Sequence, residues 1–466
     1  MTNIADALAE KLGADRLVTD EAAVAAHRTD YWILAHLRRR QGRLAAPPLA
    51  VVQPRNPGEV ATVVEIARAH RTPIVPYGGG SGVVGGATPD AGALVVDLRR
   101  MDQLLEVNDA ALTARAQAGL LGGDFERLLN ARGYVSGHYP QSLALASLGG
   151  LVATRSAGQF STLYGNMEDL CLGLEVVLSS GAIARMTPTP RSATGPSLRE
   201  IFLGSEGALG IITEVTVRIF PTPEHRALSA WTFDGMGPAL DAIRRIMRVG
   251  WRPAVVRLYD AFEASQWHFK QWVPENKCAL LLLSEGPAAL VAAEEGACAA
   301  IAVAAGGTAI GAAPVEHWLE RRNHVPSWDQ FLDQEMMVDT IEISATWDRV
   351  GALYDGVIAA LKSRPGMLVA SAHSSHSYRQ GTNLYVTFAV KPEKFADAEA
   401  AYVGAWAAVM EATLAAGGSI SHHHGIGRMR VPWIERELGT AYPVLRALKH
   451  VLDPDGLMNP GVLLPA

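Results

Sequence analysis

The chain has 466 residues, of which 49% are hydrophobic and 19% are charged, a composition typical of a globular protein. Its 41 Lys and Arg against 47 Asp and Glu give a formal net charge of −6, and no basic block indicates a nucleic-acid or anionic-membrane partner. The length exceeds one hydrophobic core and predicts two or three domains. The three cysteines, Cys171, Cys278 and Cys298, lack metal-site spacing and indicate thiols in a reducing compartment, so we expect a cytoplasmic protein.

Residues 1–43 predict helices and begin with an amphipathic pattern that lacks the apolar core of a signal peptide. The longest uncharged stretch, residues 296–315, is rich in alanine and is interrupted by glycines. We therefore expect a helix over residues 287–305, a turn and a strand, and no stable membrane insertion.

Residues 44–222 open with a β–α–β pattern whose helix starts at Pro57 after an Asn56 cap. The second strand leads into a glycine loop, residues 78–92, which contains seven glycines. Glycine tolerates positive φ and lets backbone N–H groups point at an anion, so a phosphate or pyrophosphate is the predicted ligand. An ordinary surface turn is the alternative.

One part of this loop, GSGVVG at residues 80–85, satisfies the dinucleotide fingerprint G-x-G-x-x-G. That fingerprint requires a helix opening at its third glycine. Here a further glycine, a proline and then the strand-like ALVVDL follow. A glycine loop between two strands favours the pyrophosphate loop of a different flavin-binding fold.

Residues 223–420 alternate strands and helices, which predicts an antiparallel sheet backed by helices, an α+β cap. Residues 421–466 contain a loop, a helix and an extended tail.

The glycine loop resembles the pyrophosphate loop of FAD enzymes of the vanillyl-alcohol oxidase and para-cresol methylhydroxylase superfamily. Further segments similar to that superfamily follow in order, at residues 140–150, 164–169, 204–214 and 459–461. The resemblance implies an α+β fold in which residues 44–222 and the C-terminal segment 421–466 bind FAD and residues 223–420 cap it. The active site would lie between the two parts.

The FAD-binding residues that the resemblance implies are mostly glycines and small polar residues, whose amides and hydroxyls suit a buried ribityl chain and pyrophosphate. They are Pro76, Gly78, Gly79, Gly80, Ser81, Gly82, Gly85, Gly86, Pro140, Ser142, Leu143, Ser147, Gly149, Gly150, Thr154, Ser156, Ala157, Gly158, Gly204, Glu206, Gly207, Gly210, Ile211 and Ile212. Ser81 stands where some relatives attach the flavin through a histidine, so the resemblance implies non-covalent FAD.

Within the superfamily the chain most resembles alkylglycerone-phosphate synthases, through residues 156–170, 190–196 and the triplet segment SHHHGIG at 421–427. The resemblance implies that His138, His423, His424 and Tyr385 are catalytic, with Tyr385 abstracting a proton. It also implies that Arg257 and His422 bind the substrate.

Tyr385 lies in the strand-like GTNLYVTFAV, residues 381–390. With a period of two, Leu384, Val386, Phe388 and Val390 share a core face, whereas Tyr385 and Thr387 face the other way. The alternative is that Tyr385 only packs. A phenol base needs a lowered pKa, which neighbouring histidines or the flavin could supply.

The three consecutive histidines of the triplet could be a solvated loop or a metal site. Neighbours on an extended segment alternate faces, so all three could converge only with a bend. Metal-dependent hydroxyacid dehydrogenases of the superfamily carry Glu-His at 423–424 and another histidine at 385, and this chain has lost both ligands. We expect no functional metal, and we interpret His373 and His376 as structural or pocket-lining.

The substrate half gives mixed signals. The arginine that alkylglycerone-phosphate synthases use for the substrate phosphate would fall near position 328, where this chain has Trp328. Trp318 and Arg321 instead resemble the W-x-x-R segment of D-2-hydroxyacid dehydrogenases, whose arginine binds a carboxylate. A solvated helix face is the alternative for Arg321.

We therefore expect an FAD-dependent oxidoreductase. It would oxidise a hydroxy acid or alcohol by hydride transfer to flavin N5, while Tyr385 or a triplet histidine takes the hydroxyl proton. The alternative is a non-redox synthase of the alkylglycerone-phosphate type that works through an FAD N5 adduct. A small-molecule substrate is the expected partner. The sequence leaves open the substrate identity, the electron acceptor and the oligomeric state, a homodimer included.

Overall fold

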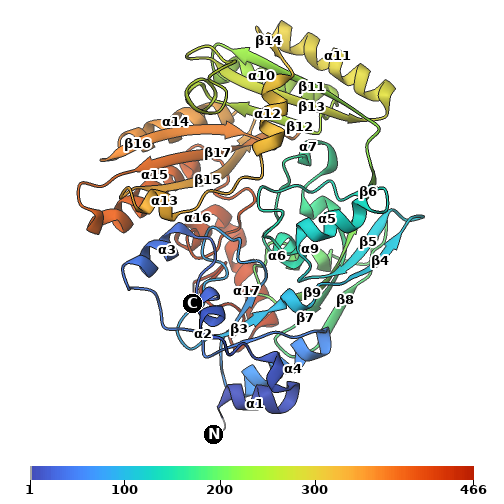
Figure 1. Cartoon of the computed structure of the whole chain (residues 1–466), viewed down its shortest axis with the longest axis vertical. Helices are drawn as coiled ribbons and strands as arrows, with labels where there is room; N and C mark the ends of the chain where they lie inside the picture. Colours follow the sequence, from blue (N-terminus) through green and yellow to red (C-terminus); the bar gives the residue numbers. More distant parts are fainter. Residues whose placement is uncertain (1–2, 466) are drawn as a thin grey trace.

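The computed structural model describes residues 3–465, which form two halves stacked along the long axis of the molecule (Figure 1). The lower half in this view contains the sheets of the predicted flavin-binding region, and the upper half contains the sheet of the predicted cap. Both halves combine helices with sheets. The α+β fold that the sequence predicts is confirmed.

The glycine loop belongs to a small parallel sheet in the lower half, whose strand order is β1-β3-β2. These strands are β1 (Ala50–Val52), β2 (Ile74–Tyr77) and β3 (Leu94–Asp97), and α4 (Pro57–Ala69) connects the first two. As predicted, α4 follows an Asn56 cap, which accepts the Glu59 N–H at 2.9 Å. The loop joins β2 to β3 without an intervening helix, which excludes a Rossmann-type turn.

A five-stranded antiparallel sheet completes the lower half, in the order β4-β5-β9-β7-β8. Its strands are β4 (Leu104–Asn108), β5 (Thr113–Gln117), β7 (Cys171–Val177), β8 (Ile183–Met186) and β9 (Ile211–Arg218). The helices of this region are α5 (Gly122–Asn130), α6 (Leu148–Ala153), α7 (Ser161–Tyr164), α8 (Met167–Leu170) and α9 (Leu198–Phe202). The short strands β6 (Tyr134–Val135) and β10 (Phe220–Pro221) pair just before the chain enters the cap.

The cap is built on a seven-stranded antiparallel sheet in the order β14-β11-β13-β12-β16-β17-β15. Its strands are β11 (His225–Phe233), β12 (Val255–Tyr259), β13 (Cys278–Gly286), β14 (Thr308–Gly311), β15 (Met337–Thr346), β16 (Met367–Ser374) and β17 (Gly381–Val390). Its long helices are α10 (Met236–Val249), α11 (Ala288–Ala304), α14 (Val350–Lys362) and α15 (Ala398–Ala415). These helices bury their apolar side chains against the sheet, so the predicted helix-backed sheet is confirmed.

The opposite face of the cap sheet points toward the lower half. The predicted alternation in β17 explains this, because Leu384, Val386 and Phe388 are fully buried in the cap core. Tyr385 and Thr387 instead line a cavity on the other face. Helix α12 (Ala313–Arg321) covers part of that face (Figure 1).

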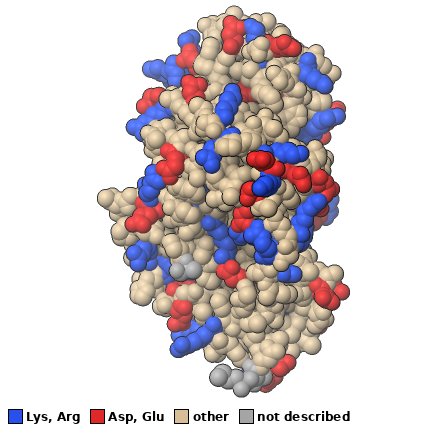
Figure 2. Space-filling view, turned by 90° about the vertical axis from the view of Figure 1, so that its left-hand side faces the viewer, with Lys and Arg blue, Asp and Glu red and all other residues tan. Residues whose placement is uncertain are grey.

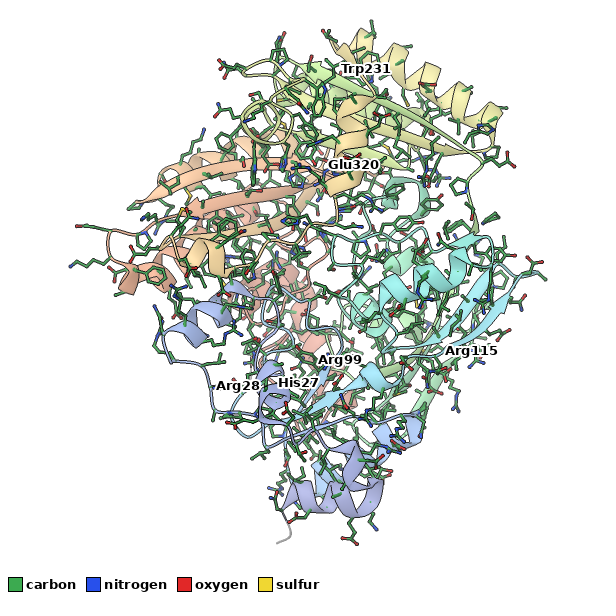
Figure 3. The ribbon with its side chains drawn as sticks, in the orientation of Figure 1. His27, Arg28, Arg99, Arg115, Trp231 and Glu320 are labelled. Atoms are coloured by element: carbon green, nitrogen blue, oxygen red, sulfur yellow. The ribbon has the colours of Figure 1, made fainter. Side chains whose placement is uncertain are left out.

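The N-terminal segment contacts both halves. Helix α1 (Ile4–Leu12) packs on the lower half, and α3 (Ile33–Arg40) packs into the cap core, where the Trp32 indole donates to the Tyr402 hydroxyl at 3.1 Å. Beyond α2 (Glu21–Ala26), His27 and Arg99 meet over the buried Asp97 carboxylate (Figure 3). The C-terminal segment returns to the lower half through α16 (Ile434–Leu438) and α17 (Tyr442–Leu452), where the Asn459 N–H pairs with the Ile74 carbonyl at 2.8 Å.

On the face shown in Figure 2, basic and acidic side chains are interspersed. Within residues 3–465, no helix is both long and apolar enough to cross a membrane.

Substitutions on the two faces of β17 should destabilise the protein to different extents. Phe388→Ala should destabilise the protein by about 3–5 kcal/mol, because it removes a fully buried ring from the cap core. Thr387→Ala, on the cavity face of the same strand, should cost less, about 1.5–2 kcal/mol, because it removes only a methyl group and a hydroxyl bonded to the buried Glu263 carboxylate. Denaturant unfolding of both variants checks this, and equal losses would show that the strand's faces are wrongly assigned.

Candidate active site

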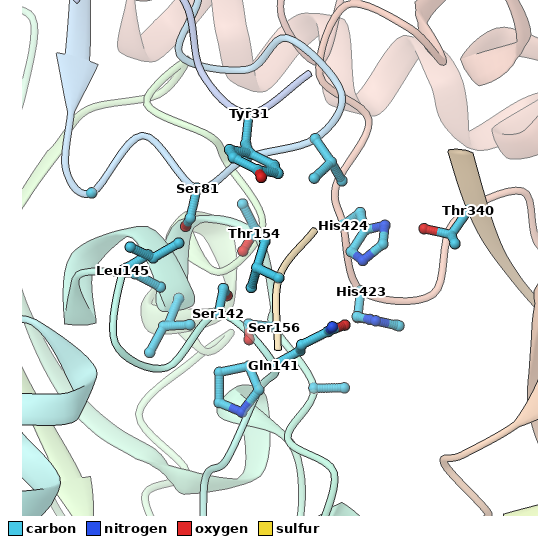
Figure 4. A pocket seen from close by; sticks show the side chains of 18 of the residues that line it. Tyr31, Ser81, Gln141, Ser142, Leu145, Thr154, Ser156, Thr340, His423 and His424 are labelled. Atoms are coloured by element: carbon cyan, nitrogen blue, oxygen red, sulfur yellow. The ribbon is translucent and has the colours of Figure 1, made fainter. Parts of the chain in front are cut away.

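A cavity of about 980 Å³ lies between the two halves. Its size is at the upper end of the range for ligand pockets, which suits a large cofactor together with a small substrate. Figure 4 shows Ser81, Ser142, Thr154 and Ser156 on one side and Thr340, His423 and His424 on the other. Tyr31, from the N-terminal segment, closes part of the space between them.

Most of the predicted FAD-binding residues line this cavity: Pro76, Gly78, Gly79, Gly80, Ser81, Gly82, Gly86, Pro140, Ser142, Ser147, Gly149, Gly150, Thr154, Ser156, Ala157, Glu206, Gly207, Gly210, Ile211 and Ile212. Four predicted residues do not line it, namely Gly85, Leu143, Gly158 and Gly204. The glycines among these four are needed for packing, since a Cβ would meet Trp32 at Gly85, the Tyr139 backbone at Gly158 and the Arg155 side chain at Gly204. Leu143 instead packs at the edge of an apolar cluster.

Close contacts with neighbouring segments explain why these positions of the loop are glycines, and without side chains the loop backbone stays uncovered in the cavity. A Cβ at Gly79 would stand 1.6 Å from the Leu145 carbonyl oxygen, and one at Gly78 would stand 2.1 Å from Ser147 Oγ. Gly80 has a φ of 66° and faces the Tyr77 hydroxyl. Bare amides and neighbouring hydroxyls suit a pyrophosphate and ribityl chain, so these residues fit the expected FAD.

On the cap side, Arg257 lines the cavity without a carboxylate partner among residues 3–465. Its Nη2 donates to His373 Nε2 at 2.8 Å, and its guanidinium lies 5.5 Å from the Trp318 ring centroid. Arginine can only donate, so His373 accepts at Nε2 and donates from Nδ1 to Glu263 Oε2 at 2.8 Å. His373 is therefore a neutral ring with a fixed tautomer, and the Arg257 charge remains available to an anion.

Tyr385 stands beside this group, with its ring stacked on His373 at 4.8 Å between centroids. Thr340 Oγ1 donates to the Tyr385 hydroxyl at 3.0 Å, which leaves the phenol proton free. Burial raises the pKa of Tyr385 to about 12. Thr340 and Arg257 do lower this pKa, but burial, together with the carboxylates of Glu342 and Asp339, outweighs them, so in the chain alone the expected net lowering is not found. Tyr385 is therefore a hydrogen-bond donor at neutral pH.

The triplet histidines occupy different positions. His423 and His424 line the cavity, whereas His422 lies behind His423 and does not line it, contrary to the expected substrate contact. His422 Nδ1 is 2.8 Å from His423 Nδ1, and His422 Nε2 is 2.7 Å from the Tyr378 hydroxyl. Burial is the main cause that holds the pKa of His423 well below its usual value and lowers that of His422 to about 4. Both rings are neutral at pH 7.

Residues 422–424 form the bend that the sequence requires for neighbouring triplet rings to converge, but the rings that come together include His422 and His423 and not His424. One ring nitrogen each of His376, His422 and His423 lies within 4.8 Å of the others. His376 lines the cavity, as does His373, which agrees with their interpretation as pocket-lining residues. Absence of a functional metal remains a prediction.

The triplet segment is held by carboxylates from both halves. Glu342 of β15 accepts the His424 N–H at 2.7 Å and pairs with the fully buried Arg430 at 2.6 Å. Burial alone would raise the pKa of Glu342, but Arg430 and His424 hold that pKa well below its usual value. Glu206 of the lower half accepts the N–H groups of Ile426 at 2.7 Å and Gly427 at 2.9 Å. The sequence does not predict Glu342 and Arg430 as site residues, because no motif includes either of them and they meet only through tertiary packing.

Three further predicted residues lie around the cavity. His138 does not line it but bonds through Nε2 with Ser156 Oγ at 3.0 Å, and burial lowers the pKa of His138 to about 3. His138 is therefore placed to orient Ser156 instead of contacting a substrate. Arg321 and Trp328 both line the cavity; Arg321 is exposed, and the Trp328 indole donates to the Tyr31 carbonyl at 2.8 Å.

Gly79→Ala should abolish flavin retention, because the new Cβ would displace the Leu145 backbone and move the loop. Gly235→Ala is the control, since its Cβ would meet nothing within 4 Å. The measurement is the FAD released by acid from each purified variant. A Gly79→Ala protein with one FAD per chain would show that the loop does not hold the cofactor.

Burial raises the pKa of Glu206 to about 7, above the 4.5 of a free carboxyl. The folded state then binds more protons than the unfolded state between these values, so this group's contribution to stability falls as the pH rises from about 5 to 7. Glu206→Gln, which still accepts both N–H groups, should remove that part of the pH dependence. Thermal unfolding midpoints between pH 5 and 8 check this, and an unchanged slope would contradict a buried, proton-binding Glu206.

The comparisons with known proteins cover nearly the whole chain. Residues 48–187 match the model of the FAD binding domain, and residues 222–463 match that of the C-terminal domain of FAD linked oxidases. An uncharacterised FAD-linked oxidoreductase of Escherichia coli O157:H7, YgcU, is 37% identical over 99% of this chain and 98% of its own length. Glycolate oxidase subunit GlcD of Bacillus subtilis (strain 168) is 29% identical over 89% of this chain and 88% of its own.

Solved structures show the same fold. An alkyldihydroxyacetonephosphate synthase superposes with a TM-score of 0.83 at 27% identity, covering 99% of this chain and 86% of the other. A p-cresol methylhydroxylase shares the fold with a TM-score of 0.74 at 17% identity, over 98% and 96% of the two chains. The chain therefore belongs to the FAD-linked oxidase family, with the para-cresol methylhydroxylase type of FAD-binding fold, and it is an FAD-dependent enzyme.

Proposed function

We propose that this enzyme oxidises a small 2-hydroxy acid, with non-covalently bound FAD as the hydride acceptor. The observation that carries the proposal is the unpaired Arg257 guanidinium in the cavity wall beside Tyr385 and His423. An arginine held in one orientation binds a carboxylate through two parallel hydrogen bonds. The relative named as a glycolate oxidase subunit supports the same substrate class.

The arrangement around Arg257 favours an anionic substrate over a neutral alcohol. The guanidinium is fixed by His373 and Tyr259 and lies against the aromatic rings of Trp318 and Tyr259, so its orientation is set before a ligand arrives. A partly buried charge without a carboxylate partner costs free energy, and an incoming carboxylate offsets that cost. Arg321, exposed at the end of α12, adds positive charge to the same wall.

The proton chemistry falls to Tyr385 and His423. FAD, when bound, supplies the acceptor for the substrate's C–H hydride. Tyr385 is protonated at neutral pH and would donate a hydrogen bond to the substrate hydroxyl oxygen. His423 is neutral and presents one ring nitrogen to the cavity, because the other is bonded to His422. We therefore assign His423 as the base that takes the hydroxyl proton.

The second candidate is a non-redox synthase, which the similarity to alkyldihydroxyacetonephosphate synthase over 99% of the chain favours. Trp328 weighs against it, since this side chain is uncharged and its indole donates to the Tyr31 carbonyl. Anaerobic mixing with glycolate, lactate and longer 2-hydroxy acids separates the two. Bleaching of the flavin absorbance supports the oxidase, and a flavin that none of these acids bleaches would contradict it.

Arg257→Met should weaken binding of the 2-hydroxy acid about 100-fold, because a charge-assisted bidentate contact contributes about 1.5–3 kcal/mol. The measurement is the substrate concentration dependence of flavin reduction by stopped flow. Arg379→Met, an exposed arginine outside the cavity, is the control. An unchanged dependence in Arg257→Met would remove Arg257 from substrate binding.

Tyr385→Phe should leave the fold and FAD content intact, because only a hydroxyl is lost, but should slow flavin reduction about 10²-fold. Combining it with His423→Ala should not multiply the two losses, since groups that act together on one substrate hydroxyl are non-additive. If the Tyr385→Phe enzyme is reduced at nearly the wild-type rate, the tyrosine only packs.

A further inference from the structure

His423 continues into a chain of hydrogen bonds that leaves the cavity. His423 Nδ1 is 2.8 Å from His422 Nδ1, and His422 Nε2 is 2.7 Å from the Tyr378 hydroxyl. The Asn166 side-chain amide lies 2.6 Å from the same hydroxyl. His422 does not line the cavity, and Tyr378 is only partly buried, at the boundary where the loop after β16 meets the start of α8. The chain therefore runs from the cavity wall to the junction of the two halves.

We propose that His423, His422 and Tyr378 form a proton relay that carries the substrate hydroxyl proton away from the inner wall of the cavity. This inference rests on the proposed function. His423 would be the catalytic base, and His422 and Tyr378 would act through it. Neither His422 nor Tyr378 lines the cavity, so neither can contact the substrate directly.

Each bond in the chain can reverse its direction. When His423 Nδ1 donates to His422 Nδ1, His422 Nε2 donates to Tyr378, and His423 Nε2 is free to accept. When His423 Nε2 takes a proton from the substrate, the His423 Nδ1 proton moves to His422 Nδ1. The His422 Nε2 proton then moves to the Tyr378 oxygen. The former phenol proton passes to water at the junction. One proton enters and one leaves, and every group ends neutral.

Asn166 is suited to the outer end of this chain. Its amide nitrogen donates to the Tyr378 hydroxyl oxygen at 2.6 Å, and this bond persists whether the hydroxyl proton points to water or to His422. The Asn166 side chain also accepts from the Asp169 backbone N–H in the capping box at the start of α8, which fixes the orientation of the amide. Asn166 therefore holds the Tyr378 oxygen in place at the outer end of the relay without competing for its proton.

A bound divalent metal is the competing use of these rings, because His376 Nδ1 or Nε2 also lies within 4.8 Å of His422 and His423. Two histidines on one tetrahedral zinc, with Zn–N bonds of about 2.0–2.1 Å, place their nitrogens about 3.3 Å apart. The 2.8 Å between the His422 and His423 nitrogens is shorter and matches a hydrogen bond. Burial also lowers the pKa of both His422 and His423, so both rings are neutral, as the relay requires.

The first test needs no substrate. In the FAD-loaded protein labelled with ¹⁵N at histidine, long-range proton–nitrogen spectra distinguish protonated from bare ring nitrogens. The relay requires that one of His422 and His423 carries its proton on Nδ1 and the other on Nε2, both neutral at pH 7. His422→Gln and His423→Gln assign the signals. The same tautomer in both rings, a charged ring, or one zinc per chain in the purified protein would overturn the proposal.

The second test measures proton transfer. Tyr378→Phe should slow flavin reduction by a 2-hydroxy acid about tenfold and enlarge its solvent isotope effect, since proton exit becomes rate-limiting. The control is Tyr164→Phe, which removes a buried hydroxyl bonded to Glu285 at 2.6 Å from the same junction and should stay within about twofold of wild type. A wild-type rate and isotope effect in Tyr378→Phe would overturn the relay. If no hydroxy acid reduces the wild-type flavin, the proposed function fails, and the tautomer measurement alone decides the relay.

Discussion

The triplet segment is fixed by two buried carboxylates that belong to different halves of the molecule. Glu342 of the cap accepts backbone N–H groups at its start, and Glu206 of the flavin-binding half accepts those at its end. Because Arg430 compensates the Glu342 charge, that carboxylate can remain ionised in a fully buried position. Every feature of the site that involves His423 or His424 depends on this pair of contacts, since they set where the bend falls.

The position of the triplet segment determines how the side chains of the cavity contact one another. The bend turns His423 toward Tyr385 on one side, at 5.9 Å between ring centroids, and toward His422 on the other. Tyr385 in turn stacks on His373, whose tautomer is set by Glu263 and which holds Arg257 in place. Direct contacts thus connect Arg257, His373 and Tyr385, which lie on the neighbouring cap strands β12, β16 and β17. Tyr385 in turn faces His423, the proposed base.

The sequence predicted the flavin half better than the substrate half, and the reason is physical. Residues such as Gly79 and Gly80 are required by close backbone approach, which leaves a local pattern that reads directly from the chain. The period-two alternation around Tyr385 likewise reports which face of a strand is buried. By contrast, Glu342 and Arg430 are 88 residues apart and meet only through tertiary packing. The pKa of Tyr385 could not be predicted either, because burial by distant segments decides it.

The N-terminal segment gives the cavity a particular mode of access. Through α1 it is attached to the flavin-binding half, and through Trp32, bonded to Tyr402, it is attached to the cap. The triplet segment joins the same two halves at a second place. A rigid-body rotation of the cap that leaves both of these contacts intact can turn only about the line that joins them. The six-residue π-helix Glu263–His268 carries Trp267, an aromatic side chain that is 53% exposed and also lines the cavity, so the rim where a substrate enters includes this short element.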